Sequence, residues 1–145
     1  MRILAFLILA ASTACAPAAT ETAEPTESVS MATDDLITEP AALLGEYRVA
    51  GVDGKDINLP HGISASISAE EIAVLSQCVR FKWAYTLAGG GFAASRVPTV
   101  SCQRGLFPEE EAISRAFDRA VQVRGTPANG IEFSGEGHSV TLFSQ

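Results

Sequence analysis

Three cysteines carry the most distinctive chemistry in this chain, and their positions divide it in two. Cys15 follows a short apolar run at the start, whereas Cys78 and Cys102 lie far downstream, in the segment richest in aromatic residues. A cysteine pair can form a disulfide, remain as two thiols, or supply half of a metal site. The odd third cysteine needs a fate of its own, and acylation is one such fate.

The downstream pair fits a disulfide better than the other two fates. A bond between Cys78 and Cys102 would close a loop of about 25 residues and add about 3.5 kcal/mol in the chain-entropy model. No Cys-x-x-Cys motif occurs, and neither His61 nor His138 has a neighbour at the spacing of a metal ligand. We expect a disulfide, no metal and no cofactor, with free thiols or a metal half-site as the alternatives.

Catalytic residue types are present, but no known motif joins them. The chain has no Gly-x-Ser-x-Gly, no His-Glu-x-x-His and no phosphate-binding glycine loop ahead of a helix. Residues 89–91 are three glycines between two predicted strands, as is typical of a hairpin turn. Residues 109–111 are glutamates that diverge by about 100° each around a helix, which favours a solvated helix start over a cation site. We expect no enzymatic activity, and a hydrolase ranks as the last alternative.

The start of the chain is typical of a secretory leader. Arg2 supplies a positive charge, residues 3–11 are apolar without interruption, and residues 10–14 are small. An apolar run of that length covers about 14 Å as a helix, whereas a bilayer needs roughly 20 residues. We therefore expect residues 1–15 to be a signal peptide that ends at the cysteine, and not a transmembrane helix.

Cys15 directly follows Ala14, and this junction resembles the bacterial lipoprotein box, in which a small residue precedes an acylated cysteine. Ser12 departs from that box, which prefers Leu or another branched aliphatic residue at this position. Ala16 implies the outer membrane, because aspartate after the cysteine is the usual signal for inner-membrane retention. The resemblance implies a periplasm-facing outer-membrane lipoprotein. Cleavage after Ala18 would instead remove Cys15 and give a secreted or periplasmic protein.

Residues 16–40 have the composition of a disordered acidic linker. They contain no Lys or Arg and few large apolar residues, so they cannot repay the entropy of ordering the chain. The remaining residues 41–145 hold eleven acids against nine bases, so most of the net charge of −7 belongs to the linker. An exported, acidic chain is a poor partner for nucleic acid. The linker's acids are Glu21, Glu24, Glu27, Asp34, Asp35 and Glu39.

Residues 41–145 are the size of one small domain, and strand-like alternation dominates them. Large apolar residues and polar or small residues alternate through residues 79–87, which predicts a half-buried strand. Three glycines then lead to a returning strand at residues 92–96, before Pro98. Further strands are expected at residues 46–52, 63–68, 71–76, 121–125, 131–134 and 139–143.

One segment has helical rather than strand periodicity. Pro108 and the glutamates after it suit a first helical turn, where a missing amide costs nothing and negative charge meets the helix dipole. Apolar residues then recur every three or four positions, at Ile113, Ala116, Phe117, Ala120 and Val121. We predict an α+β fold in a single domain: a curved, mostly antiparallel β-sheet packed on one amphipathic helix at about residues 108–121.

Phe81, Trp83 and Tyr85 share one face of the predicted strand. Such a stripe is most often the core of a small domain, although it can also line a pocket for an apolar or glycan ligand. Trp83 and Tyr85 each carry a polar atom that needs a partner, so they are the candidate rim of a pocket. Arg80 and Lys82 on the other face could meet an anionic partner, but two such cations usually mark the solvated side.

The order of these segments resembles the META domain, the HslJ-like module of bacterial envelope lipoproteins. The resemblance covers nearly all of residues 43–144 and rests on a Leu-Gly-Glu-Tyr opening, two cysteines flanking a Tyr-containing hairpin, an acidic helix and an apolar last strand. Gln77-Cys78-Val79 stands where that family usually has Gly-Cys-Asn. The resemblance implies an α+β domain without established catalytic residues, associated with envelope stress, drug tolerance or virulence.

Two classes of function follow from these expectations. The first is a non-catalytic binding or structural module of the envelope, monomeric, held to the membrane through Cys15, with an envelope protein or a small apolar ligand as its partner. It would act in envelope stress or drug tolerance. The alternative is a small disulfide-stapled inhibitor or assembly factor, lysozyme-inhibitor-like or secretin-pilot-like. It would act on another envelope protein through one exposed loop, at residues 101–107 or 53–61.

Overall fold

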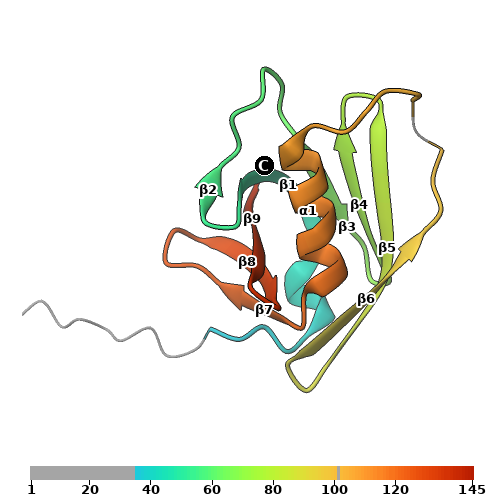
Figure 1. Cartoon of the computed structure of the whole chain (residues 1–145). Coiled ribbons are helices and arrows are strands. Elements are labelled where there is room, and N and C mark those ends of the chain that lie inside the picture. The colour runs from blue at the N-terminus through green and yellow to red at the C-terminus, as the bar shows by residue number, and fades with distance from the viewer. Residues whose placement is uncertain (1–34, 101) are drawn as a thin grey trace, which may run out of the picture. The chain divides into compact units, whose positions relative to one another are not determined.

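The computed structural model describes residues 35–100 and 102–145, which belong to one compact unit. The expected leader, Cys15 and the linker up to residue 34 lie outside the described residues. Figure 1 shows the elements of the domain in chain order. They are the 3-10 helix Pro40–Leu43, β1 Gly45–Val52, β2 Lys55–Asp56, β3 Ser64–Ile67, β4 Glu71–Ser76, β5 Val79–Ala88, β6 Gly91–Val97, α1 Pro108–Arg119, β7 Gln122–Gly125, β8 Gly130–Gly135 and β9 His138–Ser144.

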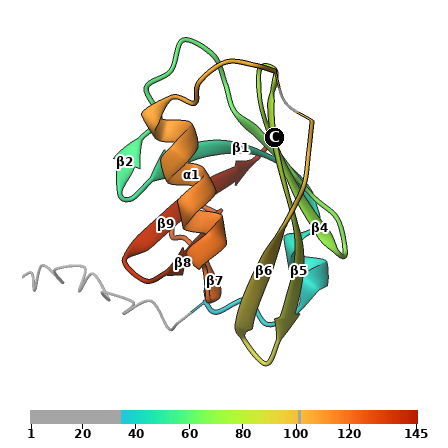
Figure 2. The same ribbon diagram turned by 45° about the vertical axis from the view of Figure 1, so that its right-hand side comes forward.

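The strands form one antiparallel sheet that curls until its ends nearly meet. Its order is β6-β5-β4-β3-β1-β9-β8-β7, with β2 beside β1. The amide of Phe92 in β6 donates to the carbonyl of Val121, just before β7, at 2.8 Å. Helix α1 lies on the concave side, where it contacts β9, β8, β6 and β1 (Figures 1 and 2). This architecture confirms the predicted fold class of a curved antiparallel sheet on a single helix.

Strand β5 shows why the alternation in the sequence was informative. Buried and non-buried residues alternate along its whole length from Val79 to Ala88. Both edges of β5 are paired, one with β4 and the other with β6. The burial of each side chain therefore depends only on which face of the sheet it lies on. One face meets the helix and the core, and the other meets solvent.

Helix α1 ends at Arg119, slightly before the expected end near residue 121. Ala120 has extended backbone angles, with φ −62° and ψ 134°, and the chain then enters β7. Ala120 nevertheless buries its side chain, whereas 55% of Val121 is exposed. The apolar periodicity therefore predicted too late an end for the helix, because Ala120, the first residue after α1, still faces the core.

The fold also includes residues before position 41, which the composition had assigned to the linker. Leu36 pairs with Arg124 of β7, and the amide of Ile37 donates to the carbonyl of Val123 at 2.9 Å. Leu36 also packs against the β5–β6 turn, where a Cβ on Gly90 would lie 2.5 Å from its side chain. The domain therefore begins no later than residue 35, because two apolar residues in a polar segment find partners in the sheet.

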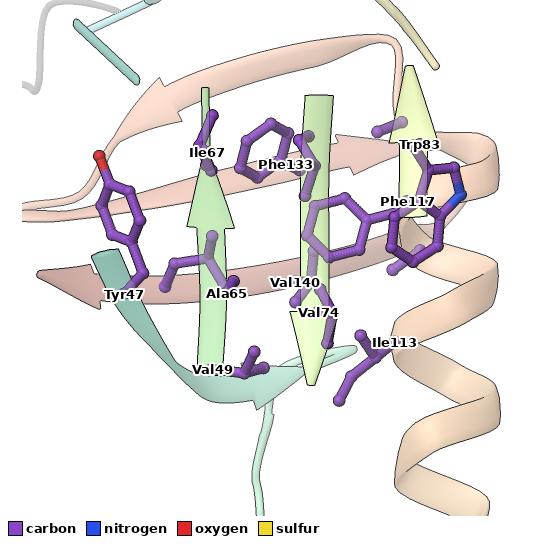
Figure 3. Packing of buried hydrophobic residues seen from close by; sticks show 14 of the residues in the cluster. Tyr47, Val49, Ala65, Ile67, Val74, Trp83, Ile113, Phe117, Phe133 and Val140 are labelled. Carbon is purple, nitrogen blue, oxygen red and sulfur yellow. The ribbon is translucent and has the colours of Figure 1, made fainter. Parts of the chain in front are cut away.

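The core lies between the concave face of the sheet and α1 (Figure 3). Trp83 of β5 stacks near Phe117 of α1, with ring centroids 4.8 Å apart, and Phe117 in turn lies 5.2 Å from Phe133 of β8. All three side chains are fully buried. The helix thus joins the two halves of the sheet through aromatic contacts. Within the described residues, no helix is long and apolar enough to cross a bilayer.

Candidate functional site

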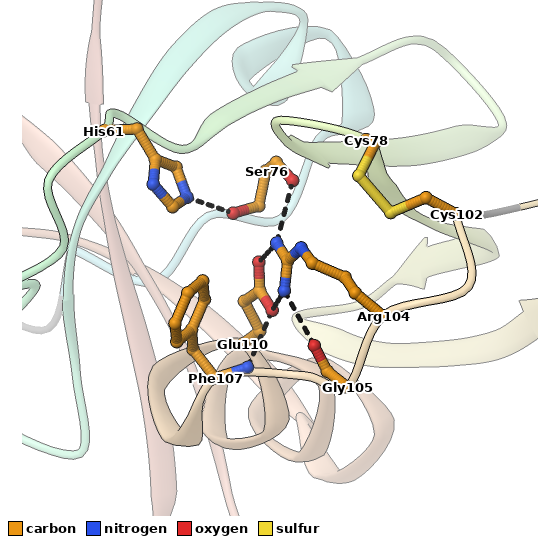
Figure 4. The surroundings of a disulfide bond; sticks show 8 residues. All are labelled: His61, Ser76, Cys78, Cys102, Arg104, Gly105, Phe107 and Glu110. Atoms are coloured by element: carbon orange, nitrogen blue, oxygen red, sulfur yellow. Dashed lines mark hydrogen bonds and ion pairs between the residues drawn. A yellow bond between two sulfur atoms is a disulfide. The ribbon is translucent and has the colours of Figure 1, made fainter.

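Cys78 and Cys102 form a disulfide at one end of the domain (Figure 4). Their Cα atoms are 5.5 Å apart, and the amide of Cys102 donates to the carbonyl of Cys78 at 3.3 Å. Cys78 lies in the turn between β4 and β5, whereas Cys102 lies in the segment that leads from β6 to α1. The bond therefore attaches that segment to the sheet.

A buried ion pair lies beside the disulfide and was not expected from the sequence. Glu110 has no exposed surface, and its two carboxylate oxygens accept hydrogen bonds from Arg104 at 2.6 and 2.9 Å. Arg104 also donates to the carbonyl of Ser76 in β4 at 3.5 Å. The expectation of a solvated helix start is therefore wrong at its middle glutamate. Burial here is compensated by a two-point contact with a guanidinium group.

Glu110 also closes the first turn of α1. The amide of Phe107 donates to a Glu110 oxygen at 2.8 Å, which satisfies one of the free amides at the helix start. Phe107 is the N-cap and Pro108 begins the helix, so Glu110 occupies the third helical position. A glutamate three residues after the N-cap is one half of the capping-box pattern, but Phe107 lacks the side-chain oxygen of the other half, so the sequence signal is incomplete.

The ionisation of Glu110 reflects these contacts. Burial by itself raises the pKa of this carboxyl group, but hydrogen bonding by Arg104, with Ser76 and the Phe107 amide, outweighs burial and lowers the pKa from 4.5 to about 2. Glu110 is therefore charged at neutral pH. The pairing also raises the pKa of Arg104, so both partners keep their charge.

The lowered pKa of Glu110 predicts a particular loss of stability in acid. A carboxyl group whose pKa is lower in the folded protein stabilises the fold above its unfolded pKa of about 4.5, and that contribution is lost as the pH falls towards about 2. We expect it to amount to about 3 kcal/mol. Urea unfolding of wild type and Glu110→Gln should show a large gap in stability at pH 6 that nearly closes at pH 2. A gap of constant size would contradict the assignment.

Ser76 and His61 lie next to the Arg104–Glu110 ion pair, on the side of the sheet, and complete a cluster of four polar side chains. Ser76 is fully buried, and its hydroxyl lies 2.8 Å from Nε2 of His61. A serine beside a histidine is a familiar nucleophile arrangement, but a hydroxyl without exposed surface cannot meet a substrate. Among the described residues, no group of His, Cys, Asp and Glu is placed to hold a metal ion. The cluster is therefore suited to holding the fold together.

The two loops considered for partner binding meet at this same end. The His61 ring, at the end of residues 53–61, lies 6.0 Å from the Phe107 ring, and the Arg104 guanidinium lies 4.7 Å from that same ring. Leu106 and Phe107 are 40% and 38% exposed. Figure 1 shows both loops at the end of the domain opposite the described N-terminal residues. The structure thus joins two separate candidate loops into one surface.

A groove of 690 Å³ crosses the outer face of β1, β3, β4 and β5. Two rows of cross-strand neighbours form it. Both rows have small or hydroxylated residues over β3, and longer side chains at β1 and β5, which leaves the middle of the face hollow. The first row is Glu46, Ser66, Ala73, Lys82 and Val97, and the second is Arg48, Ser64, Leu75 and Arg80. All of them line the groove except Arg48, which lines an adjoining hollow of 480 Å³ that shares Ser64 and Leu75.

The charges of this outer-face groove favour an anionic group. Arg48, Lys82 and Arg80 lie along its two rows, against Glu46 alone, although Lys82 also pairs with Glu71 at 3.1 Å. The carboxylate of Glu46 accepts a hydrogen bond from the hydroxyl of Ser66, with 2.5 Å between the two oxygens. Residues 97–100 add an apolar wall, in which Val100 is 92% exposed. The groove therefore combines cations, hydroxyl groups and an exposed apolar side chain.

Trp83 and Tyr85, the candidate pocket rim, instead lie in the core. Both are buried, and each polar atom has a partner within the fold: the indole NH of Trp83 donates to Asp118 at 2.7 Å, and the hydroxyl of Tyr85 donates to the carbonyl of Ser68 at 2.8 Å. The groove lies on the opposite face of β5, beside Arg80 and Lys82. In β5, Arg80 and Lys82 therefore indicate the position of the groove, whereas the aromatic residues indicate the core.

Comparison with known proteins adds little to this geometry. No protein-family model matches the chain, and no curated protein matches its sequence. Among solved structures, the chain is similar to a protein from Burkholderia xenovorans determined by NMR. The TM-score is 0.49 and the identity 19%, over 84% of this chain and 97% of that chain. The function proposed below rests on the residues of the site.

Proposed function

We propose that this protein is a non-catalytic binding module of the bacterial envelope, of the META/HslJ-like type. The outer-face groove is the observation that carries the proposal. It offers cations and hydroxyl groups beside an apolar wall, as expected of a site for a small amphipathic ligand with an acidic group. The fully buried hydroxyl of Ser76 supports a binding role over a catalytic one.

The proposal places the domain at a membrane through its N-terminal segment. Acylation of Cys15 would anchor the chain in the outer membrane, and residues 16–34 would connect the anchor to the domain. Intact-mass analysis of protein extracted from its native envelope tests this part. A chain that begins at Cys15 and carries acyl groups is the expected mass. An unlipidated chain that begins beyond Cys15 would replace the anchor with a diffusible protein.

Ligand binding in the groove can be tested by amide NMR with matched variants. We expect a fatty acid, a lysophospholipid or a muropeptide to shift the amides of Ser64, Ala73 and Arg80 in a saturable way. Ala73→Trp should abolish the shift, because it fills the hollow over β4. Ala84→Trp is the control, since Ala84 is exposed on the same face but outside the groove. Binding that survives Ala73→Trp, or no binding of any probe, would contradict the proposal.

A second candidate is an inhibitor or assembly factor that acts on another envelope protein. The observation that favours it is the contact between His61 and Phe107, which joins the loop residues 53–61 and 102–107 into one surface with exposed apolar side chains. That surface faces away from the described N-terminal residues, so a tethered domain would present it outwards (Figure 2).

Affinity capture from intact envelopes can test this second candidate. Wild type should recover one protein in stoichiometric amount, and Leu106→Asp should lose it. Val121→Asp is the control, because Val121 is equally apolar and 55% exposed but lies beyond the far end of α1. Equal recovery by both variants, or no partner at all, would count against the loop surface.

A further inference from the structure

The disulfide, the buried ion pair and the start of α1 form one connected unit. Cys102 precedes Arg104 by two positions, and Arg104 holds Glu110, which in turn accepts the Phe107 amide. On the sheet side, Cys78 lies two positions after Ser76, whose carbonyl also accepts a hydrogen bond from Arg104. Figure 4 shows all these groups around the disulfide. Residues 102–107 are thus attached to the sheet at two neighbouring points, one covalent and one ionic.

The disulfide is also placed where a reductant can reach it. Cys78 is exposed in the turn between β4 and β5, and Cys102 is half-buried. Gln77, just before Cys78, adopts a left-handed backbone with φ 55° in this turn. A fully buried disulfide would be protected from exchange, whereas this one joins an exposed residue to a half-buried one.

We propose that the Cys78–Cys102 bond is a redox switch that controls residues 102–107 and the first turn of α1 while the sheet stays folded. A thiolate of an external dithiol attacks Cys78, the bond between the two sulfurs breaks, and Cys102 leaves as a thiol after taking up a proton. The second thiol of the dithiol then closes its own disulfide and releases Cys78 as a thiol. Two electrons and two protons pass from the dithiol to the cysteine pair.

Release of Cys102 weakens the ion pair because the segment that carries Arg104 loses its covalent attachment to the sheet. Glu110 has no exposed surface, and a buried carboxylate without its guanidinium partner is costly, so the helix start opens to water. The contact of Phe107 with His61 is lost at the same time. The loop surface at this end of the domain therefore exists in the oxidised protein only. The switch does not depend on what the outer-face groove binds.

Hydrogen exchange of the full chain, oxidised and then reduced with dithiothreitol, tests the switch. On reduction, the amides of Phe107 and Glu111 should lose protection, since they bond to Glu110 and to the carbonyl of Phe107. The amides of Ile72 and Val74 in the centre of the sheet should keep theirs. Unchanged protection at the helix start would overturn the proposal. Loss of protection everywhere would also overturn it, because the disulfide would then be a staple for the whole fold.

Thermodynamic coupling gives an independent measurement. If the bond and the ion pair stabilise each other, removing the pair must make the bond easier to reduce, by about tenfold in its equilibrium with dithiothreitol or about 30 mV. Glu110→Gln should show this change, and Glu111→Gln, which alters the same charge at an exposed position, should not. Arg104→Lys serves in place of Glu110→Gln if that variant does not fold. Equal reduction potentials of the disulfide in wild type and in the ion-pair variant would show that the disulfide and the ion pair are not coupled.

Discussion

Glu110→Gln should destabilise the protein by about 3 kcal/mol at pH 7, since a buried ion pair that loses one partner leaves the other uncompensated. The amide group of Gln would also place its NH₂ or its single oxygen against two donors of Arg104. Glu110 has no exposed surface and the Arg104 side chain is only 26% exposed, so water can replace little of the lost contact. Urea unfolding monitored by the fluorescence of Trp83 would measure the difference.

Glu111→Gln is the matched control for this prediction. It removes the same charge from the same helical turn, but Glu111 is exposed, so the change should stay within about 0.5 kcal/mol. The double variant Glu110→Gln with Arg104→Met should be less destabilised than the sum of the two single variants, because each already removes the pair. A loss below 1 kcal/mol in Glu110→Gln, or strict additivity, would mean that the pair contributes little.

Phe117→Ala should cost about 4 kcal/mol of stability, among the largest effects expected in this domain. Phe117 is fully buried and lies 4.8 Å from the Trp83 ring and 5.2 Å from the Phe133 ring. Its removal leaves a cavity between α1 and both halves of the sheet. Among the described residues, α1 is the α-helix that covers the concave face, so the cavity would have to be filled by movement of α1 itself.

Arg115→Ala provides the comparison for Phe117→Ala. Arg115 lies in the same helix, is exposed, and should change stability by no more than about 0.5 kcal/mol. Thermal unfolding of the two variants should therefore separate clearly, with the transition of Arg115→Ala close to that of wild type. If both variants unfolded together, α1 would not be the core element that its contacts indicate.

The fold could be predicted because its main signals are local. Alternation through β5 marks a strand with one buried face, and the three-to-four spacing after Pro108 marks a helix with one apolar stripe. Residues 35–40 were not predicted as part of the domain because their composition is polar. Contacts distant in sequence hold them there: Leu36 packs on Gly90, and residues 35–37 pair with β7. Partners distant in sequence leave no local pattern to detect.

The site was predicted less completely, for the same reason. The cysteine pair was expected from its number and spacing, whereas Arg104 and Glu110 looked like ordinary surface charges of a loop and a helix start. Their pairing depends on how residues 102–107 return to the sheet, which a pattern of charges does not encode. The groove was also missed, because it depends on the small side chains of Ser64, Ser66 and Ala73, which become neighbours only after β3 and β4 pair.

The pairing of residues 35–37 with β7 has a mechanical consequence for a domain held by its N-terminus. A pull from that side first meets the hydrogen bonds to Val123 and Gly125, at the open edge of the sheet. Peeling residues 35–39 away would lengthen the connection by about 17 Å. Only then would the load reach the 3-10 helix with its buried Leu43 and, after it, β1, which is bonded to β3 and β9 on its two sides. The segment can therefore yield first under tension and spare the groove and the sheet.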